Sequence, residues 1–442
     1  MTNAPAFLTL PTADEIIRSF TINCERVEMT AGLVKLLTDT VNACMCKSEP
    51  EQKTGLDGDA EQKTAQLLTK CDQLIDYTWE KLNTGHWKDV RLEWRLAYAM
   101  LSLCKTVTLA ANGDNVEQMK LAIRSCDMGL LMGAPICSNV LARVASQLHR
   151  RLNQLDQACA TWQLQHSQQT SNSVTSANGH PVMIDSEAPP PAKCPRMHEH
   201  QPSARVARHR ALSVIQFKEQ YLQKQTPVVL VGLAADWPSV QKWSVEHILR
   251  VARHRLVPVE VGSRYTEDSW SQQLITVGEF VDKFIRNETD EPGYLAQHEL
   301  FEQIVELGQD VLVPDYCHVH DNDDDVSVNA WFGPAGTISP LHQDPRDNVF
   351  VQIFGRKLVR LISPTFTEHV YPFTEGMLTN TSQVDVENPD LEHYPRFAEA
   401  LVDEIELGPG DGLFMPRKWW HFVRSVEPSF SISYWFGPAA DT

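Results

Sequence analysis

The chain has 442 residues, of which 42% are hydrophobic and 22% charged, an ordinary composition for a globular protein. Its 57 acidic residues outnumber its 39 basic ones, which gives a formal net charge of −18. Nucleic-acid affinity depends on lysine and arginine side chains that neutralise phosphates, so direct nucleic-acid binding is not expected. The acidic surface favours basic peptides as partners, although solubility alone would also explain it.

The cysteines and the N-terminus predict an intracellular protein. The ten cysteines form no regular framework, and a free cysteine in a helix acts as a small apolar filler, so a reducing compartment is expected. The opening residues MTNAPA contain no basic segment followed by an apolar one. No apolar run approaches the ~18 residues of a membrane span. We therefore expect no membrane association and a location in the nucleus and cytoplasm.

Residues 1–162 are predicted to form an all-α domain. Apolar residues recur at every third or fourth position through Trp87, Trp94 and Leu101, which marks one face of a helix. Residues 112–115 should end that helix and cap the next one. The successive segments look like helical hairpins and have a faint similarity to helical repeats, which suggests a protein-interaction module.

Residues 163–204 are predicted to be a disordered linker, because they are rich in serine, glutamine and proline and offer almost nothing apolar to bury. Within this segment, Cys194, His198 and His200 resemble part of a zinc site. No fourth ligand lies nearby, so a solvated linker is the favoured interpretation. The arginines within 205–210 are either a weak nuclear address or the charged edge of the next helix.

Residues 205–442 are predicted to form a barrel rich in β-structure. Short apolar runs at 228–231, 349–353 and 430–434 alternate with glycine and proline turns, a pattern typical of a sandwich or jelly-roll barrel. Residues 276–279 have the form of a capping box that opens a helix, so helices should flank the barrel. The predicted fold class is α+β, with a double-stranded β-helix of the cupin type behind an all-α domain.

His342 and Asp344, together with the distant His421, have the composition of a non-haem iron site. Two imidazoles and one carboxylate occupy one face of Fe(II) and leave the other face open for a cosubstrate and O₂. His342 and Asp344 lie two positions apart, so on a strand both side chains point to the same side. His318 and His320, which precede an acidic loop, are a rival ligand set.

Lys357 is the candidate for binding 2-oxoglutarate. Iron in such a site needs electrons to activate O₂, and 2-oxoglutarate supplies them in this class of enzyme. Its far carboxylate requires a buried cation. Lys357 begins the strand predicted after the turn at 354–356. Spacing alone equally predicts a hairpin lysine at the edge of the solvent.

Three longer motifs resemble the JmjC-domain dioxygenases: WFGPAGTISPLH at 331–342, NTSQVDV at 380–386 and FSISYW at 430–435. The resemblance covers the predicted barrel, and the layout of a helical half followed by a polar linker is also similar. It implies an Fe(II)- and 2-oxoglutarate-dependent dioxygenase that uses O₂. The implied metal ligands are His342, Asp344 and His421. The implied 2-oxoglutarate residues are Tyr294, Ser339, Asn348, Lys357 and Trp435.

The resemblance also implies a substrate pocket made by Glu260, Trp270 and Trp331. A carboxylate receives a guanidinium through two parallel hydrogen bonds, and an indole face packs against its plane. Without the resemblance, Glu260 would be an ordinary outward strand residue and Trp270 an ordinary core anchor. We therefore expect hydroxylation of arginine at C3 in a protein or peptide substrate that carries arginine or a basic tail.

Demethylation of N-methyl-lysine in a histone H3 tail, the activity of a chromatin regulator, is the main alternative, because the family includes both chemistries. A trimethylated ammonium would require an aromatic cage without hydrogen-bond acceptors, and no zinc-binding reader domain accompanies the barrel. A histone-tail peptidase is a weaker alternative, since no nucleophile or open zinc site is evident. A non-catalytic binding scaffold is disfavoured because all three metal ligands and Lys357 are present.

Overall fold

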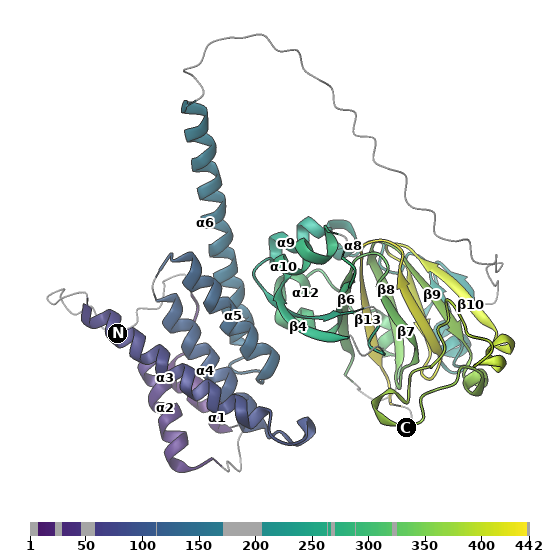
Figure 1. Cartoon of the computed structure of the whole chain (residues 1–442), viewed down its shortest axis with the longest axis horizontal. Helices are drawn as coiled ribbons and strands as arrows, with labels where there is room; N and C mark the ends of the chain where they lie inside the picture. Colours follow the sequence, from purple (N-terminus) through teal and green to yellow (C-terminus); the bar gives the residue numbers. More distant parts are fainter. Residues whose placement is uncertain are drawn as a thin grey trace, which may run out of the picture.

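The computed structural model of the chain describes residues 8–22, 29–45, 58–111, 113–170, 206–262, 264–266, 270–287, 289–320 and 325–439. Helices form the N-terminal part of the molecule, whereas strands with short helices form the C-terminal part (Figure 1). This arrangement confirms the predicted α+β fold class with an all-α first half. Within the described ranges, no helix combines the length and the apolar character that crossing a bilayer requires.

The N-terminal helices pack around α4 (Leu92–Ala110), which contacts α2, α3 and α5 and is buried along almost its whole length. The chain breaks after α4 at the predicted place. The Asn115 side chain caps the next helix by accepting a hydrogen bond from the Gln118 amide at 3.0 Å. The other helices are α1 (Ala13–Ile22), α2 (Ala31–Met45), α3 (Gly58–Leu82), α5 (Val116–Met132) and α6 (Val140–Thr170), with the single turn η1 (Trp87–Asp89).

Two β-sheets face each other in the C-terminal part and form the predicted jelly-roll barrel. Phe350 and Leu413 from one sheet and Leu361 from the other fill the space between them. The nine-stranded sheet has the order β1 (Ala207–His209), β2 (Val228–Leu230), β11 (Gly412–Met415), β8 (Asp347–Phe354), β13 (Ser429–Phe436), β6 (Ser327–Gly333), β5 (Gly293–His298), β3 (Leu256–Val261), β4 (Ser271–Thr276). The four-stranded sheet has the order β10 (Val402–Leu407), β9 (Lys357–Ile362), β12 (Trp420–Ser425), β7 (Ile338–Gln343).

Short helices cover the larger sheet, as expected. Phe217, Ile248 and Phe280 from these helices belong to one core cluster with Phe332 and Ile432 of the sheet. The predicted capping box is present at the start of α10. The helices are α7 (Val214–Phe217), α8 (Pro238–Lys242), α9 (Val245–Ala252), α10 (Val277–Phe280), α11 (Leu300–Gln303) and α12 (Val305–Gly308). Single-turn elements are η3 (Lys218–Leu222), η4 (Val281–Ile285), η5 (Asp315–His318), η6 (Pro364–His369), η7 (Gly376–Leu378) and η8 (Pro395–Glu399).

The predicted division at 162 and 204 stays a prediction. Helix α6 continues to Thr170, so the beginning of the predicted linker is helical. The rest of that linker, including Cys194, His198 and His200, lies outside the described residues. Arg208 lies on strand β1 and not on a helix edge, and it pairs with Asp411 at 3.9 Å.

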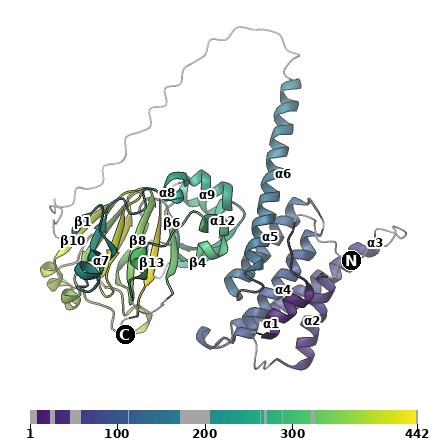
Figure 2. The ribbon, with the colours of Figure 1, turned by 180° about the vertical axis from the view of Figure 1, so that it is seen from behind.

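A buried ion pair joins the helical part to the barrel. Arg255, which directly precedes β3, donates to the carboxylate of Asp127 on α5 at 2.7 Å, and both side chains are at most 1% exposed. Asp127 also accepts hydrogen bonds from the Leu256 amide at 2.7 Å and from Gln303 Nε2 at 2.8 Å. The two parts lie side by side in opposite views, with α9 and α12 beside α6 (Figures 1 and 2). Because every charge in this network is satisfied, the network fixes the relative position of the two parts.

We expect Asp127→Ala to lower the free energy of unfolding by about 3–5 kcal/mol, because it leaves the Arg255 guanidinium buried without its partner. Urea unfolding followed by tryptophan fluorescence measures this change. The control is Asp114→Ala, which removes an exposed ion pair with Arg151 and should cost about 0–1 kcal/mol. Equal losses in the two variants would contradict the structural role of the buried pair.

Candidate active site

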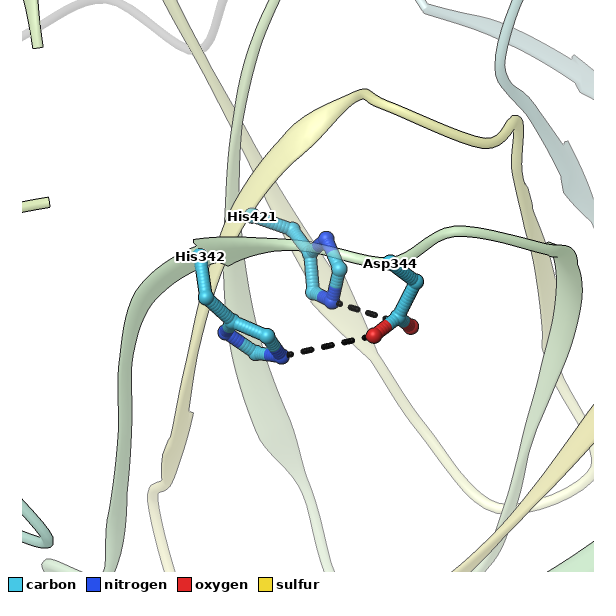
Figure 3. A group of neighbouring side chains, drawn as sticks. All are labelled: His342, Asp344 and His421. Atoms are coloured by element: carbon cyan, nitrogen blue, oxygen red, sulfur yellow. Dashed lines mark ion pairs between the residues drawn. The ribbon is translucent and has the colours of Figure 1, made fainter. Parts of the chain in front are cut away.

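His342, Asp344 and His421 converge at one end of the barrel. His342 lies on β7, Asp344 directly follows that strand, and His421 lies opposite His342 on the neighbouring antiparallel strand β12. One ligand atom from each residue lies within 4.8 Å of the others. The Nε2 atoms of His342 and His421 lie 3.9 Å and 3.6 Å from the Asp344 carboxylate, and all three side chains point to one space (Figure 3).

Backbone carbonyls hold both imidazoles in the form that binds a metal. The Nδ1 atoms of His342 and His421 lie 2.7 Å from the Pro340 carbonyl and 2.9 Å from the Trp419 carbonyl. A carbonyl only accepts, so each Nδ1 carries the hydrogen and each Nε2 keeps its lone pair for a ligand. Burial, assisted by the neighbouring His342, lowers the pKa of His421 to about 4, so this imidazole is neutral.

Asp344 is oriented by two further side chains. Trp435 Nε1 donates to Asp344 Oδ2 at 3.0 Å, and Asn348 Nδ2 lies 3.5 Å from the same oxygen. Both contacts leave Oδ1 facing His342. The donor set of two imidazoles held by backbone carbonyls and one oriented carboxylate therefore fits a divalent iron ion.

The rival ligand set does not form a comparable site. His318 is exposed, and His320 Nε2 lies 3.5 Å from Asp347. The acidic residues 321–324 lie outside the described residues. In the part of the chain that the structure describes, His342, Asp344 and His421 are the one group of three metal-ligating side chains that converges.

A cavity of about 320 Å³ adjoins the triad and is lined by all the residues that the resemblance implies for 2-oxoglutarate. Lys357 is fully buried at its inner end, and its Nζ donates to the Tyr294 hydroxyl at 2.8 Å. No carboxylate among the described residues forms an ion pair with this lysine. The lining residues that were predicted are Tyr294, Trp331, Ser339, Asn348, Lys357 and Trp435.

The polar groups of this cavity are matched to an anion. Burial lowers the pKa of Lys357 to about 7, so a bound carboxylate would stabilise its charged form. Burial also raises the pKa of Tyr294, which keeps its hydroxyl protonated. The residues present fit 2-oxoglutarate, whose carboxylate far from the metal would be paired with the buried Lys357.

A larger cavity of about 1190 Å³ reaches His342 and Asp344 of the triad and contains the predicted substrate residues. Glu260 lies on β3, and Trp270 precedes β4. Trp270 Nε1 donates to Glu260 Oε2 at 3.3 Å. Burial raises the pKa of the Glu260 carboxyl, opposed by the hydrogen bond from Trp270. Trp331 lines this cavity as well as the smaller one, so the two cavities meet at the metal centre.

Tyr265 and Gln297 are among the residues of the larger cavity that sequence reasoning missed. The Tyr265 hydroxyl lies 3.2 Å from Thr381 Oγ1 on the opposite rim. Its position between Glu260 and Trp270 in the sequence could have indicated it. Gln297 carries no such signal, because its placement depends on an irregularity of β5.

Both parts of the chain are similar in sequence to known proteins. A family described as a cupin-like domain matches residues 214–442, and one described as KDM8-like, N-terminal ARM repeats matches residues 59–161. The chain is 43% and 42% identical to lysine-specific demethylase 8 of Xenopus tropicalis and Danio rerio, over 82% of this chain and 87% and 86% of those proteins. It is 34% identical to Jumonji C domain-containing protein 5 of Drosophila melanogaster, over 82% of this chain and 85% of that protein. The chain belongs to the JmjC family.

As a JmjC protein, the chain is a 2-oxoglutarate-dependent oxygenase, which confirms the predicted enzyme class. The triad is compatible with the Fe(II) that this family generally uses. The ARM-type repeats agree with an N-terminal part suited to protein interaction. The roles of the individual side chains stay predictions.

We expect His342→Ala and His421→Ala each to weaken metal binding by more than about 100-fold, because each removes one of three ligands. Titration with Mn(II), with the free ion measured by electron paramagnetic resonance, tests this. His318→Ala is the control and should bind Mn(II) as the unmodified protein does. Metal affinity that survives loss of His342 would refute the assignment.

We expect the affinity for 2-oxoglutarate to fall about tenfold per pH unit as the pH rises above about 7. The free Lys357 amine loses its proton near that pH, whereas the bound dianion requires the amine to be charged. Calorimetry on the Mn(II)-loaded protein measures this slope. In Lys357→Arg the guanidinium stays charged, so the slope should disappear. An identical slope in both proteins would exclude Lys357 as its origin.

Proposed function

We propose that this JmjC protein hydroxylates an arginine side chain at C3 in a protein or peptide substrate. The observation that carries the proposal is the half-buried Glu260 carboxylate beside Trp270, in the cavity that reaches the metal triad. A carboxylate in this setting suits a guanidinium, which donates two parallel hydrogen bonds to it. The Trp270 ring provides a flat face for the guanidinium plane.

Fe(II) with 2-oxoglutarate and O₂ supplies the oxidising power: one oxygen atom enters the substrate C–H bond, and the other leaves in succinate as CO₂ is released. The chain's own residues position the reactants. Lys357 and Tyr294 would hold the far carboxylate of 2-oxoglutarate in the smaller cavity. Glu260 holds the guanidinium at the mouth of the larger one, which leaves the aliphatic carbons of the arginine nearer the triad.

One strand pairing links the two binding sites. Glu260 on β3 lies directly opposite Tyr294 on β5, and the Tyr294 hydroxyl accepts a hydrogen bond from Lys357. Directly opposed residues in an antiparallel pair have neighbouring side chains. The substrate carboxylate and the cosubstrate cation therefore share one wall, which supports a fixed distance between the two reactants.

Demethylation of N-methyl-lysine is the second candidate, and the names of the relatives support it directly, since two of them are lysine-specific demethylases. The larger cavity also contains the aromatic side chains of Tyr265, Trp270 and Trp331, which suit a methylated ammonium. Hydroxylation of an N-methyl group gives an unstable product that releases formaldehyde. The same centre would thus perform both reactions, and the substrate decides between them.

The remaining parts of the proposal concern organisation. We infer a helical domain at 1–162, a linker at 163–204 and a catalytic domain at 205–442, with the helical domain as a protein-interaction module. The net charge of −18 supports a basic protein segment as partner. A histone-tail substrate would require a nuclear location, whereas other basic proteins would also allow the cytoplasm.

We expect Glu260→Gln to lower kcat/KM for an arginine peptide by about 10- to 100-fold, because the neutral amide replaces a charge-assisted pair of hydrogen bonds. Mass spectrometry of the peptide, with a gain of one oxygen atom on arginine, measures the product. Trp270→Phe is the matched control: it keeps an aromatic face and removes only the hydrogen bond to Glu260, so its loss should be smaller.

Arginine and mono-, di- and trimethyl-lysine versions of one peptide should be assayed side by side. Formaldehyde release from the methyl-lysine peptides, with no oxygen gained on arginine, would refute hydroxylation and establish the second candidate. Lack of turnover on every peptide, with 2-oxoglutarate consumption at background, would refute both.

A further inference from the structure

A cleft of about 1320 Å³ lies between the helical part and the barrel. One wall consists of the end of α5 and the loop that follows it, including Leu131 and Pro135. The other wall consists of β5, α11 and β6, including Gln297 and Glu302. We call this space the interdomain cleft.

The interdomain cleft is continuous with the candidate substrate cavity. Gln297 and Trp435 line both spaces, and Trp435 donates a hydrogen bond to the metal ligand Asp344 at 3.0 Å. The pairing of β5 with β6 is irregular between Leu295 and His298, and Gln297 adopts a positive φ of 45° there. Such a bulge redirects a side chain beside a functional site, and here Gln297 borders both the cavity and the cleft.

Polar contacts between the two parts keep the interdomain cleft open at a fixed width. Asn139 Nδ2, in the loop before α6, donates to the Glu302 carbonyl on α11 at 3.0 Å. Gln303, which lines the cleft, donates to the buried Asp127 at 2.8 Å. The walls are therefore held in place by the network that joins the two parts, and no closing motion is needed to form the cleft.

The lining of the interdomain cleft suits a basic peptide in an extended conformation. Glu299 and Glu302 are exposed there, and neither carboxylate forms an ion pair with a described residue. Arg95 is the one arginine or lysine among the described residues in the lining of the cleft. Leu131 and Pro135 offer apolar surface on the opposite wall. A peptide whose target side chain enters the substrate cavity would leave past Gln297 and Trp435 into this cleft.

We propose that the interdomain cleft binds the basic residues that flank the target residue of the protein substrate, so that the helical part forms one wall of the substrate groove. The inference rests on the proposed function for the position of the target side chain. Recognition of the flanking residues is independent of the chemistry performed on that side chain, so the two can be tested separately.

The experiment compares two arginine peptides on the full-length, Mn(II)- and 2-oxoglutarate-loaded protein. The short peptide has capped ends. The long peptide has basic residues within about six positions on each side of the arginine, and six residues of extended chain span about 20 Å. Fluorescence anisotropy measures their affinities. We expect the long peptide to bind at least about tenfold more tightly, and Glu299→Lys/Glu302→Lys to abolish that advantage through charge repulsion.

The matched control is Glu219→Lys/Glu392→Lys, which makes the same change of charge at exposed glutamates outside the interdomain cleft. It should keep the advantage of the long peptide, and thermal unfolding should show that both double variants are folded. Equal affinity for the two peptides, or equal loss in both double variants, would overturn the role of the cleft. Cleft-dependent binding, with no oxygen gained on arginine when the same peptides are assayed on the Fe(II)-loaded protein, would retain the cleft and refute arginine hydroxylation.

Discussion

The buried pair between Asp127 and Arg255 is the constraint on which the arrangement of the molecule depends. An ion pair removed from water contributes only when its geometry is complete, and separation of the two parts would leave each charge buried alone. Arg255 immediately precedes β3, and the same strand ends beside Glu260. The strand that attaches the helical part therefore also carries the candidate substrate carboxylate, so the substrate side of the barrel and the helical part keep a fixed relation.

A second buried cation has the opposite character. Arg255 has its carboxylate within the protein, whereas the fully buried Lys357 amine has, among the described residues, only the Tyr294 hydroxyl as a hydrogen-bond partner at 2.8 Å. Burial of an unpaired amine destabilises the folded state, since it disfavours the charged form. The binding of a dianion relieves this penalty, so part of the affinity for 2-oxoglutarate is built into the fold before the ligand arrives.

The sequence predicted the parts that depend on local patterns. His342 and Asp344 share a side because they lie two apart on a strand, and the barrel strands follow from short apolar runs between turns. From its spacing, the Lys357 side chain was equally expected to be buried or exposed. In the structure the barrel packs around this side chain and buries it. The Asp127–Arg255 pair was not predicted, because nothing local connects residues 128 positions apart. Gln297 was missed for a related reason, since a bulge reverses the inward and outward alternation that sequence patterns assume.

Glu260 also limits the second candidate function. A guanidinium offers several N–H donors to a carboxylate, and a mono- or dimethylated ammonium still offers at least one. A trimethylated ammonium offers none, so it would leave the half-buried Glu260 without a hydrogen-bond donor other than Trp270. If the barrel demethylates lysine, its own carboxylate therefore selects the lower methylation states. The arginine and demethylase interpretations thus share one physical requirement, a cationic side chain with an N–H group aimed at Glu260, while the interdomain cleft acts on the residues around it.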